Sequence, residues 1–334
     1  MRKAVRLASA ALAASLAGIA APHGPAQAQD AIRLGTSSIG STNYILAVGM
    51  SQLVRKHAAI DATVEPLGGT TAIIDGLGAK KVDFAMVSAG AAFDGAHGNA
   101  PFRRAVPVGL IAQGRSSMRF VLVRRDAGIR SVADLAGKTM IGKRRSLPDL
   151  ELIANALLDV HGVPKDKVKF VETVETAQAT AALRAGNVEA AVYPGRLDTP
   201  PLQELFRDKV VDFLDIPEAT MRNLVAKLPK YFYLAKVPAG NFQNQPKEWI
   251  SPALNTYLVA RSDAPEELVY KVTKAIMGNP AGFAAYHVEG SDWTVANALA
   301  EPKLAFHPGA IRYYKEIGAW QPVHDQLQAS LQAK

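Results

Sequence analysis

The feature that most constrains the fold is a regular alternation of short apolar segments with longer amphipathic ones. Short segments rich in β-forming residues, each bounded by turn residues, lie at 31–36, 62–66, 82–87, 106–112, 118–124, 138–142, 167–171 and 188–192. Helical patterns cover 42–57, 70–79, 147–161 and 175–185, and from about residue 263 the pattern is helical to the end. Strands that alternate with helices predict an α/β protein with parallel sheets.

The first 28 residues have the three parts of an export signal. Arg2 and Lys3 precede an apolar stretch at 6–21, and the small-residue motif Ala-Gln-Ala ends at Ala28. No segment reaches the roughly 20 uninterrupted apolar residues that span a membrane. We therefore expect 1–28 to be a cleaved signal peptide and the mature chain, from about residue 29, to be exported. An uncleaved membrane anchor is the alternative.

Charge and cysteine content narrow the possible ligands. The formal net charge of +8 includes Arg2, Lys3 and Arg6, so cleavage after Ala28 leaves about +5. The basic residues are scattered, apart from GKRRS at 142–146, which suits a small anion better than a nucleic acid. Without cysteine the chain has no disulfide framework and no thiolate metal site. The remaining residues, about 305, are enough for two lobes with a hydrophobic core.

Three loops rich in Gly, Ser and Thr each follow a predicted strand. They are GTSSIGST at 35–42, LGGTT at 67–71 and SAG at 88–90. In open α/β sheets the ligand lies beyond the carboxyl ends of the strands, where the following helices offer free N–H groups. The first loop has P-loop spacing, but Ser41 replaces the lysine that grips nucleotide phosphates. The loops predict a site for a small anion, with helix caps and tight turns as the alternative.

Motifs for catalysis are missing from the sequence. It contains neither Gly-x-Ser-x-Gly nor Ser-x-x-Lys, and its seven histidines show no His-Glu-x-x-His or other metal-binding spacing. The replacement of the P-loop lysine also argues against an NTPase. We therefore expect a protein that is not an enzyme and that has no metal and no cofactor.

Six segments together resemble one family of exported receptors. They are GTSSIGSTNY, EPLGGTTAIIDGLGAKKVDFAMVSAGAAFDGAHG, GIRSVADLAGKTMIG, AALRAGNVEAAV, LPKYFYLAKVPAGNF and HPGAIRYYKEIG. Their sequences and order resemble the TAXI family, the solute-binding proteins of tripartite ATP-independent periplasmic (TRAP) transporters. The resemblance implies a type II periplasmic binding protein fold, in which two α/β lobes joined by crossing strands close on an organic acid in the cleft. It also implies a periplasmic monomer that delivers its ligand to separate membrane subunits.

Departures from the family motifs bear on the ligand. In the first loop, Ser37, Ser41 and Asn43 replace two glycines and a tyrosine, which adds polar side chains. The third loop usually reads Gln-Ser-Asp, but here it is Ser-Ala-Gly at 88–90. Because the acidic partner for an amino group is missing, an amino-acid ligand is in doubt.

The second half of the chain has arginines where the family has small residues. A loop that usually reads Gly-Ser-Gly-Thr becomes Arg-Ser-Leu-Pro at 145–148, after Lys143 and Arg144, and Arg196 also replaces a small residue. Arginine suits bidentate recognition of carboxylates, so Arg144 or Arg145, with help from Arg196, is expected to bind the ligand. Which of Lys143, Arg144 and Arg145 faces the cleft stays open, and a solvated charge cluster is the alternative.

These observations give one functional prediction with two alternatives. The chain is predicted to be a receptor for a small carboxylate, such as a dicarboxylate or an aromatic acid. The alternatives are an exported sensor or adaptor of the same fold and a TRAP receptor for glutamate or another amino acid. The predicted ligand-binding residues are Ser37, Ser38, Ser41, Thr42, Asn43, Tyr44, Gly69, Thr70, Ser88, Arg144, Arg145, Ser146, Tyr193 and Arg196. From the break at QGRSSMRF, the first lobe is predicted to comprise 29–117 with 226–334, and the second 118–225.

Overall fold

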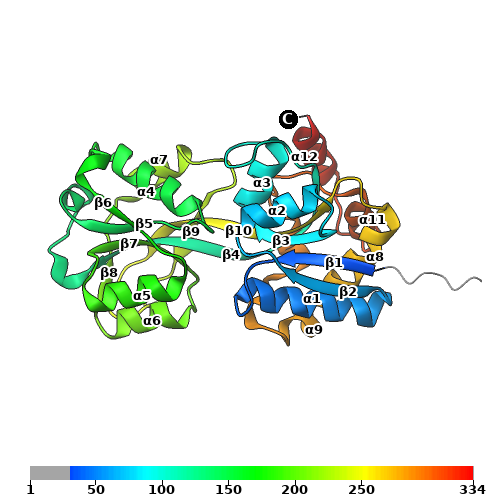
Figure 1. The fold of residues 1–334 in the computed structure, drawn as a ribbon, viewed down its shortest axis with the longest axis horizontal. Helices are drawn as coiled ribbons and strands as arrows, with labels where there is room; N and C mark the ends of the chain where they lie inside the picture. The colour runs from blue at the N-terminus through cyan, green and yellow to red at the C-terminus, as the bar shows by residue number, and fades with distance from the viewer. Residues whose placement is uncertain (1–30, 334) are drawn as a thin grey trace, which may run out of the picture.

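The computed structural model describes residues 31–333 and shows two α/β lobes joined by long strands (Figure 1). The α/β class and the two-lobed fold predicted from the sequence are confirmed. The signal peptide predicted at 1–28 lies outside the described residues. Within 31–333, no helix combines the length and the apolar character that crossing a membrane requires.

The first lobe combines the N-terminal part of the described chain with its C-terminal helices (Figure 1). Its elements are β1 (Ala31–Thr36), α1 (Thr42–Ala58), β2 (Asp61–Pro66), α2 (Thr70–Gly78), β3 (Phe84–Ser88), α3 (Ala89–His97), α8 (Glu266–Met277), α9 (Pro280–Ala284), the 3-10 helix η4 (Val288–Asp292), α10 (Val295–Leu299), α11 (Pro308–Glu316) and α12 (Pro322–Gln332). In α1, the apolar residues Leu46, Met50, Leu53 and Val54 recur at helical spacing and are buried. This spacing is why the predicted helix at 42–57 forms.

The second lobe is built from the middle of the chain. Its elements are β5 (Thr139–Lys143), α4 (Asp149–Val160), β6 (Lys169–Glu172), α5 (Thr176–Ala185), β7 (Ala190–Gly195), α6 (Pro200–Arg207), β8 (Val211–Phe213) and α7 (Glu218–Ala226), with the short 3-10 turns η1 (Arg125–Ala127), η2 (Val132–Leu135) and η3 (Lys165–Lys167). Two strands cross between the lobes, β4 (Val108–Arg124) and β10 (Trp249–Arg261), and β9 (Tyr233–Val237) pairs with β10.

The strands form one hydrogen-bonded path in the order β2-β1-β3-β10-β4-β7-β5-β6. Pairing is parallel between β1 and its neighbours β2 and β3 and between β5 and its neighbours β6 and β7. The crossing strands β4 and β10 are antiparallel to each other. The loops after β1, β2 and β3 therefore lie at the edge of the first lobe where the parallel strands end, as the sequence predicts.

The strands predicted at 106–112 and 118–124 form one continuous strand, β4, which runs through QGRSSMRF. This strand pairs with β10 from Val108 to Met118 and with β7 of the second lobe from Met118 onward, and the lobe boundary at 117/118 stays a prediction. Gly114, inside this segment, serves packing. A Cβ on Gly114 would lie 2.4 Å from Cδ2 of Trp293. A glycine inside a strand often marks such a close approach, and here it lets the indole lie against the backbone.

Contacts around β9 and β10 bear on the lobe boundary predicted at 225/226. Val237, Phe242 and Ala253 are buried in the same hydrophobic cluster as Phe120 and Leu202 of the second lobe. Residues up to about the middle of β10 thus pack with the second lobe. We propose that the return to the first lobe occurs within β10, after Ala253. The sequence did not predict β8, β9 or β10.

Candidate functional site

The hydroxyl groups of two predicted site residues cap helices. The Ser41 Oγ accepts a hydrogen bond from the Tyr44 N–H at 3.2 Å, and the Ser88 Oγ accepts one from the Ala91 N–H at 3.2 Å. Both therefore start helices, α1 and α3, as N-caps do. The other predicted residues of the first loop are exposed or half-buried: Ser37, Ser38, Thr42, Asn43 and Tyr44.

Two loops predicted to line the cleft from opposite lobes meet. Thr70 begins α2 and is 5% exposed. Its Oγ1 lies 3.5 Å from the carbonyl oxygen of Ser146, which makes a long, weak hydrogen bond. A Cβ on Gly69 would lie 3.5 Å from the Cα of Ser146. The structure thus brings Gly69, Thr70 and Ser146 together at the junction of the lobes.

Arg144 lies two residues before Ser146, and its guanidinium is buried. Arg144 is 5% exposed and donates hydrogen bonds to the Oγ1 of Thr176 at 2.9 Å and, more weakly, to the Oγ1 of Thr173 at 3.4 and 3.5 Å. Within 31–333, these two hydroxyls are the hydrogen-bond partners of the guanidinium. Burial lowers its pKa below the usual value, because the charged form loses hydration. Arg144 is a buried cation without a carboxylate in direct contact among the described side chains.

The two neighbouring cations in the sequence have different surroundings. Arg145 is exposed. The Nζ of Lys143 lies 3.0 Å from the Oε1 of Glu151, and both side chains are about 40% exposed. Of the three, Arg144 is the one whose side chain is buried.

Arg119 was not predicted as a site residue. It lies in the part of β4 that pairs with β7 of the second lobe, and it is 2% exposed. Its guanidinium forms a buried ion pair with Asp149, the first residue of α4. It also donates to the Oγ of Ser117 at 2.7 Å. The sequence does contain one signal for it. Arg119 lies on the same strand face as Val121, where the alternation of apolar and polar residues predicts an apolar side chain.

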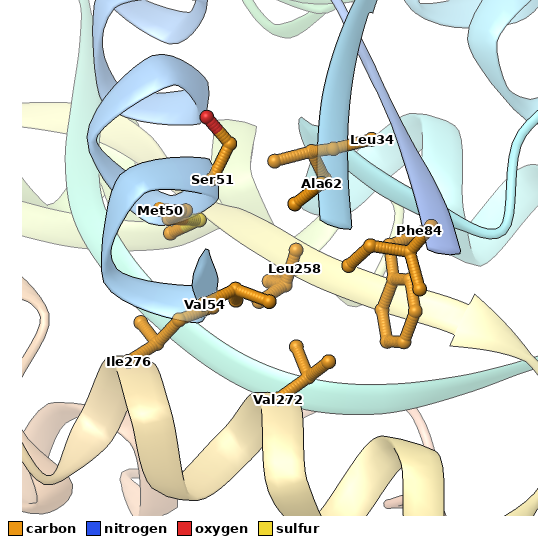
Figure 2. A pocket seen from close by; sticks show the side chains of 10 residues that line it. Leu34, Met50, Ser51, Val54, Ala62, Phe84, Leu258, Val272 and Ile276 are labelled. Atoms are coloured by element: carbon orange, nitrogen blue, oxygen red, sulfur yellow. The ribbon is translucent and has the colours of Figure 1, made fainter. Parts of the chain in front are cut away.

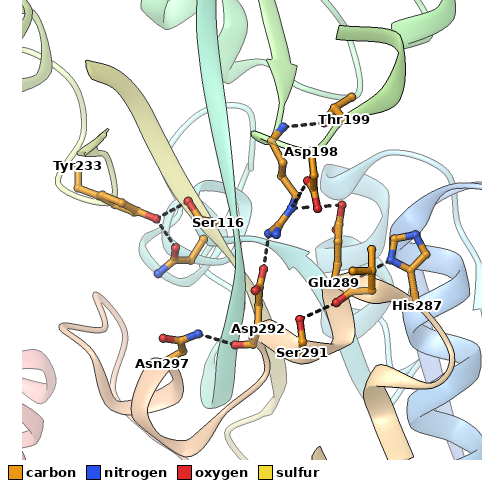
Figure 3. A network of polar contacts seen from close by, with 12 residues as sticks. Ser116, Asp198, Thr199, Tyr233, His287, Glu289, Ser291, Asp292 and Asn297 are labelled. Carbon is orange, nitrogen blue, oxygen red and sulfur yellow. Dashed lines mark hydrogen bonds and ion pairs between the residues drawn. The ribbon is translucent and has the colours of Figure 1, made fainter. Parts of the chain in front are cut away.

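Arg196 joins the two lobes (Figure 3). It follows β7 in the second lobe and contacts Asp292 and Glu289 of η4 in the first, the latter at 3.6 Å between Nε and Oε1. Its Nε also lies 3.2 Å from the Oδ1 of Asp198. Burial alone would lower the pKa of Arg196, but the carboxylates of Asp292, Glu289 and Asp198 raise it above its usual value. We call these four residues the inter-lobe ion cluster.

Tyr193 lies within the core of the second lobe. It is fully buried, and its hydroxyl is 2.8 Å from the Oγ1 of Thr180. Its ring therefore packs on other side chains of the lobe. Burial raises the pKa of its hydroxyl, and the charge of Arg144 opposes this effect.

A third segment also passes between the lobes. Tyr231 lies against the first turn of α3, where a Cβ on Gly90 would lie 2.9 Å from its Cε2, and its hydroxyl donates to the Oδ2 of Asp94 at 3.1 Å. The absence of a side chain at Gly90 thus makes room for a tyrosine ring. The hydroxyl of Tyr233 lies 2.7 Å from both the Ser116 Oγ and the Asn255 Oδ1 (Figure 3). Ser116 and Asn255 are paired residues of β4 and β10, the two strands that pass between the lobes.

One cavity in the first lobe is part of its core. Its lining is apolar except for Ser51, and Figure 2 shows that the side chains come from α1, α8 and the sheet. An organic anion has no charged partner there. The candidate site is therefore the junction around Thr70, Ser146 and Arg144.

The C-terminal motif that begins at His307 serves the fold. Its Nδ1 accepts from the Gly309 N–H at 3.2 Å, which caps α11, and its Nε2 lies 3.1 Å from the carbonyl oxygen of Ala264. Burial lowers the pKa of His307. Within the described residues, no group of three or more His, Cys, Asp or Glu side chains is placed to hold a metal ion.

Similar solved structures share the two-lobed fold at low sequence identity. XAC2383 from Xanthomonas citri, solved bound to ATP, has a TM-score of 0.55 at 12% identity and covers 91% of this chain and 99% of that chain. PhnD1 from Prochlorococcus marinus, in complex with methylphosphonate, has a TM-score of 0.54 at 13% identity and covers 87% and 99%. The periplasmic aliphatic sulphonate binding protein SsuA from Escherichia coli has a TM-score of 0.45 at 14% identity and covers 77% and 74%.

A family model covers most of the chain. The model described as the NMT1-like family matches residues 34–318, which include both lobes and the junction between them. The chain belongs to the NMT1-like family.

Proposed function

We propose that the mature protein is an exported, periplasmic receptor that binds a small organic anion between its lobes and delivers it to the membrane subunits of a TRAP transporter. The observation that carries this proposal is the setting of Arg144, whose guanidinium is buried with two hydroxyl partners, two residues before the Ser146 that meets Thr70 of the first lobe. A buried charge is costly unless it is paired or well hydrogen-bonded. An anion held between the lobes would supply the missing counter-charge.

Two further observations support an anionic ligand and a transport role. ATP and methylphosphonate, named for the two similar structures with TM-scores above 0.5, are both anions. The TRAP partner rests on the six TAXI-like segments of the sequence. The proposal requires no catalytic residue, metal or cofactor, since capture and release suffice for a receptor.

The structure refines which predicted residues we assign to the ligand. We retain Arg144, Thr70 and Ser146, together with four half-buried residues of the first loop, Ser37, Thr42, Asn43 and Tyr44. Arg145 is exposed, the hydroxyls of Ser41 and Ser88 cap helices, and Arg196 already meets carboxylates. We assign these four, with Tyr193, to solvent or to the fold.

A binding experiment on two variants tests the proposal. Residues 29–334 are purified, screened against organic acids by thermal shift, and titrated by calorimetry with each acid that raises the melting temperature. Arg144→Gln should weaken binding by at least about thirtyfold, because truncating a buried charge pair costs about 2 kcal/mol or more. Arg207→Gln removes an arginine that is 61% exposed in the same lobe, and it should leave the affinity within about twofold.

Two results would count against this function. One is a screen in which no organic acid stabilises the protein at millimolar concentration. The other is an acid that binds wild type and Arg144→Gln equally well.

A further inference from the structure

The charges of Arg119, Arg144 and Arg196 are unequally compensated, and this inequality bears on the ligand. Arg119 is paired with Asp149, and Arg196 is paired with Asp292. Arg144 has hydroxyl partners instead. Among these three, one positive charge is therefore left for a ligand.

The donors left on Arg144 match one carboxylate. A guanidinium has five N–H groups. The Nε, Nη1 and Nη2 atoms of Arg144 each donate to a threonine hydroxyl, which leaves one N–H on each Nη. A guanidinium can bind a carboxylate bidentately through one N–H on each Nη. The hydroxyls of Thr173 and Thr176 accept from Arg144, so each can still donate its own hydrogen to an oxygen of the ligand.

A second acidic group would find no free cation on the paired arginines. Arg119 and Arg196 already hold the carboxylates of Asp149 and Asp292. A desolvated carboxylate without a partner is costly. An additional carboxylate would therefore gain nothing from these two arginines and would lose its hydration.

We propose that the site between the lobes takes a monocarboxylate, received by the free N–H groups of Arg144 and the hydroxyls of Thr173 and Thr176, and that it discriminates against dicarboxylates. This inference rests on the proposed function and narrows its ligand class. It also decides between the two acids that the sequence left open, because an aromatic monoacid fits and a dicarboxylate does not.

Matched acids that differ by one carboxylate test the inference. Calorimetric titrations compare pentanoate with glutarate, hexanoate with adipate and 4-methylbenzoate with terephthalate, where the second acid of each pair replaces a methyl group by a carboxylate. For any pair that binds, we expect the monoacid to bind at least about tenfold more tightly. Glutamate and a sulfonate of matched length, 1-butanesulfonate, form two further arms.

Two variants separate charge from fork geometry. Arg144→Lys keeps the charge and loses the fork, so it should bind the monoacid more weakly and still prefer it to the diacid. Thr176→Val removes one hydroxyl donor and should weaken binding of the monoacid several-fold, while Thr180→Val serves as a control hydroxyl that bonds to Tyr193.

The outcomes distinguish this inference from the function on which it rests. A dicarboxylate or glutamate that binds as tightly as its monoacid partner would overturn the inference and leave the receptor function standing. Tighter binding of the sulfonate would also overturn it, in favour of a three-oxygen acid. If no acid of the panel binds, the proposed function fails together with the inference.

Discussion

The inter-lobe ion cluster predicts that Asp292→Asn shifts the protein from a closed toward an open arrangement of its lobes. Arg196 follows β7 of the second lobe, whereas Asp292 and Glu289 belong to η4 of the first. The ion pairs between them exist only while the lobes are in contact (Figure 3). Breaking one of them therefore lowers the stability of the closed arrangement and leaves each lobe intact.

The expected magnitude follows from distance and exposure. Two unit charges about 4 Å apart gain about 4 kcal/mol at an effective dielectric constant of about 20. The side chains of Arg196 and Asp292 are 18% and 28% exposed, so desolvation and screening offset part of this gain. We expect a net coupling of about 1–2 kcal/mol, which changes the ratio of closed to open molecules about five- to thirtyfold.

Small-angle scattering and calorimetry measure the effect. Asp292→Asn should have a larger radius of gyration than wild type without ligand and a weaker apparent affinity, because binding must then also close the lobes. Added salt should move wild type in the same direction. Glu218→Gln removes the equivalent charge from an exposed pair with Arg222 within α7 and serves as the control. The reasoning is refuted if Asp292→Asn changes neither quantity, or if its effect persists undiminished in an Arg196→Gln background.

Three further predictions concern the stability of the fold. Asp149→Asn leaves the buried Arg119 unpaired and should lower the free energy of unfolding in urea by about 3–5 kcal/mol. Glu151→Gln, in the same helical turn, should lower it by less than about 1 kcal/mol, and equal losses for the two variants would contradict this reasoning. Gly114→Ala should cost about 1–3 kcal/mol because its Cβ would overlap Trp293, while Gly282→Ala, with its nearest neighbour at 3.4 Å, should be neutral or stabilising in the same assay. Burial lowers the pKa of His307 below the value of about 6.5 that the unfolded chain has. As the pH falls, the unfolded chain therefore takes up a proton first, and the stability that neutral His307 contributes above about pH 6.5 is lost. His307→Asn, which keeps a capping side chain, should therefore have a melting temperature that falls less than that of wild type between about pH 7.5 and 5.5.

Local patterns predicted most of the first lobe, because hydrophobic spacing and capping residues act within a few positions. The helices predicted at 42–57 and 70–79 correspond to α1 and α2, which begin at Thr42 and Thr70. Each follows a loop of small residues that supplies its N-cap, Ser41 or Gly69. The pattern predicted two strands where β4 is one, because the glycine between them, Gly114, is required by Trp293 in another part of the chain.

The ion pairs of the junction could not be predicted from the sequence for a similar reason. Arg119 pairs with Asp149 across 30 residues, and Arg196 with Asp292 across 96. An arginine has the same residue type whether a carboxylate from another element meets it or not. Composition and spacing indicated an excess of positive charge, but the fold determines which of these charges is compensated.

The difference between Arg144 and Arg145 follows from what surrounds the end of β5. Met140, Ile141 and Gly142 are buried, and the chain leaves the sheet after Lys143, so two successive side chains point to different sides. The buried side is lined by Thr173, which follows β6, and by Thr176, which begins α5. These threonines are 29 and 32 residues away from Arg144 in the sequence. Because neutral hydroxyls rather than carboxylates meet Arg144 there, its charge stays available for the ligand that we propose, and no ligand motif in the sequence identified these two threonines.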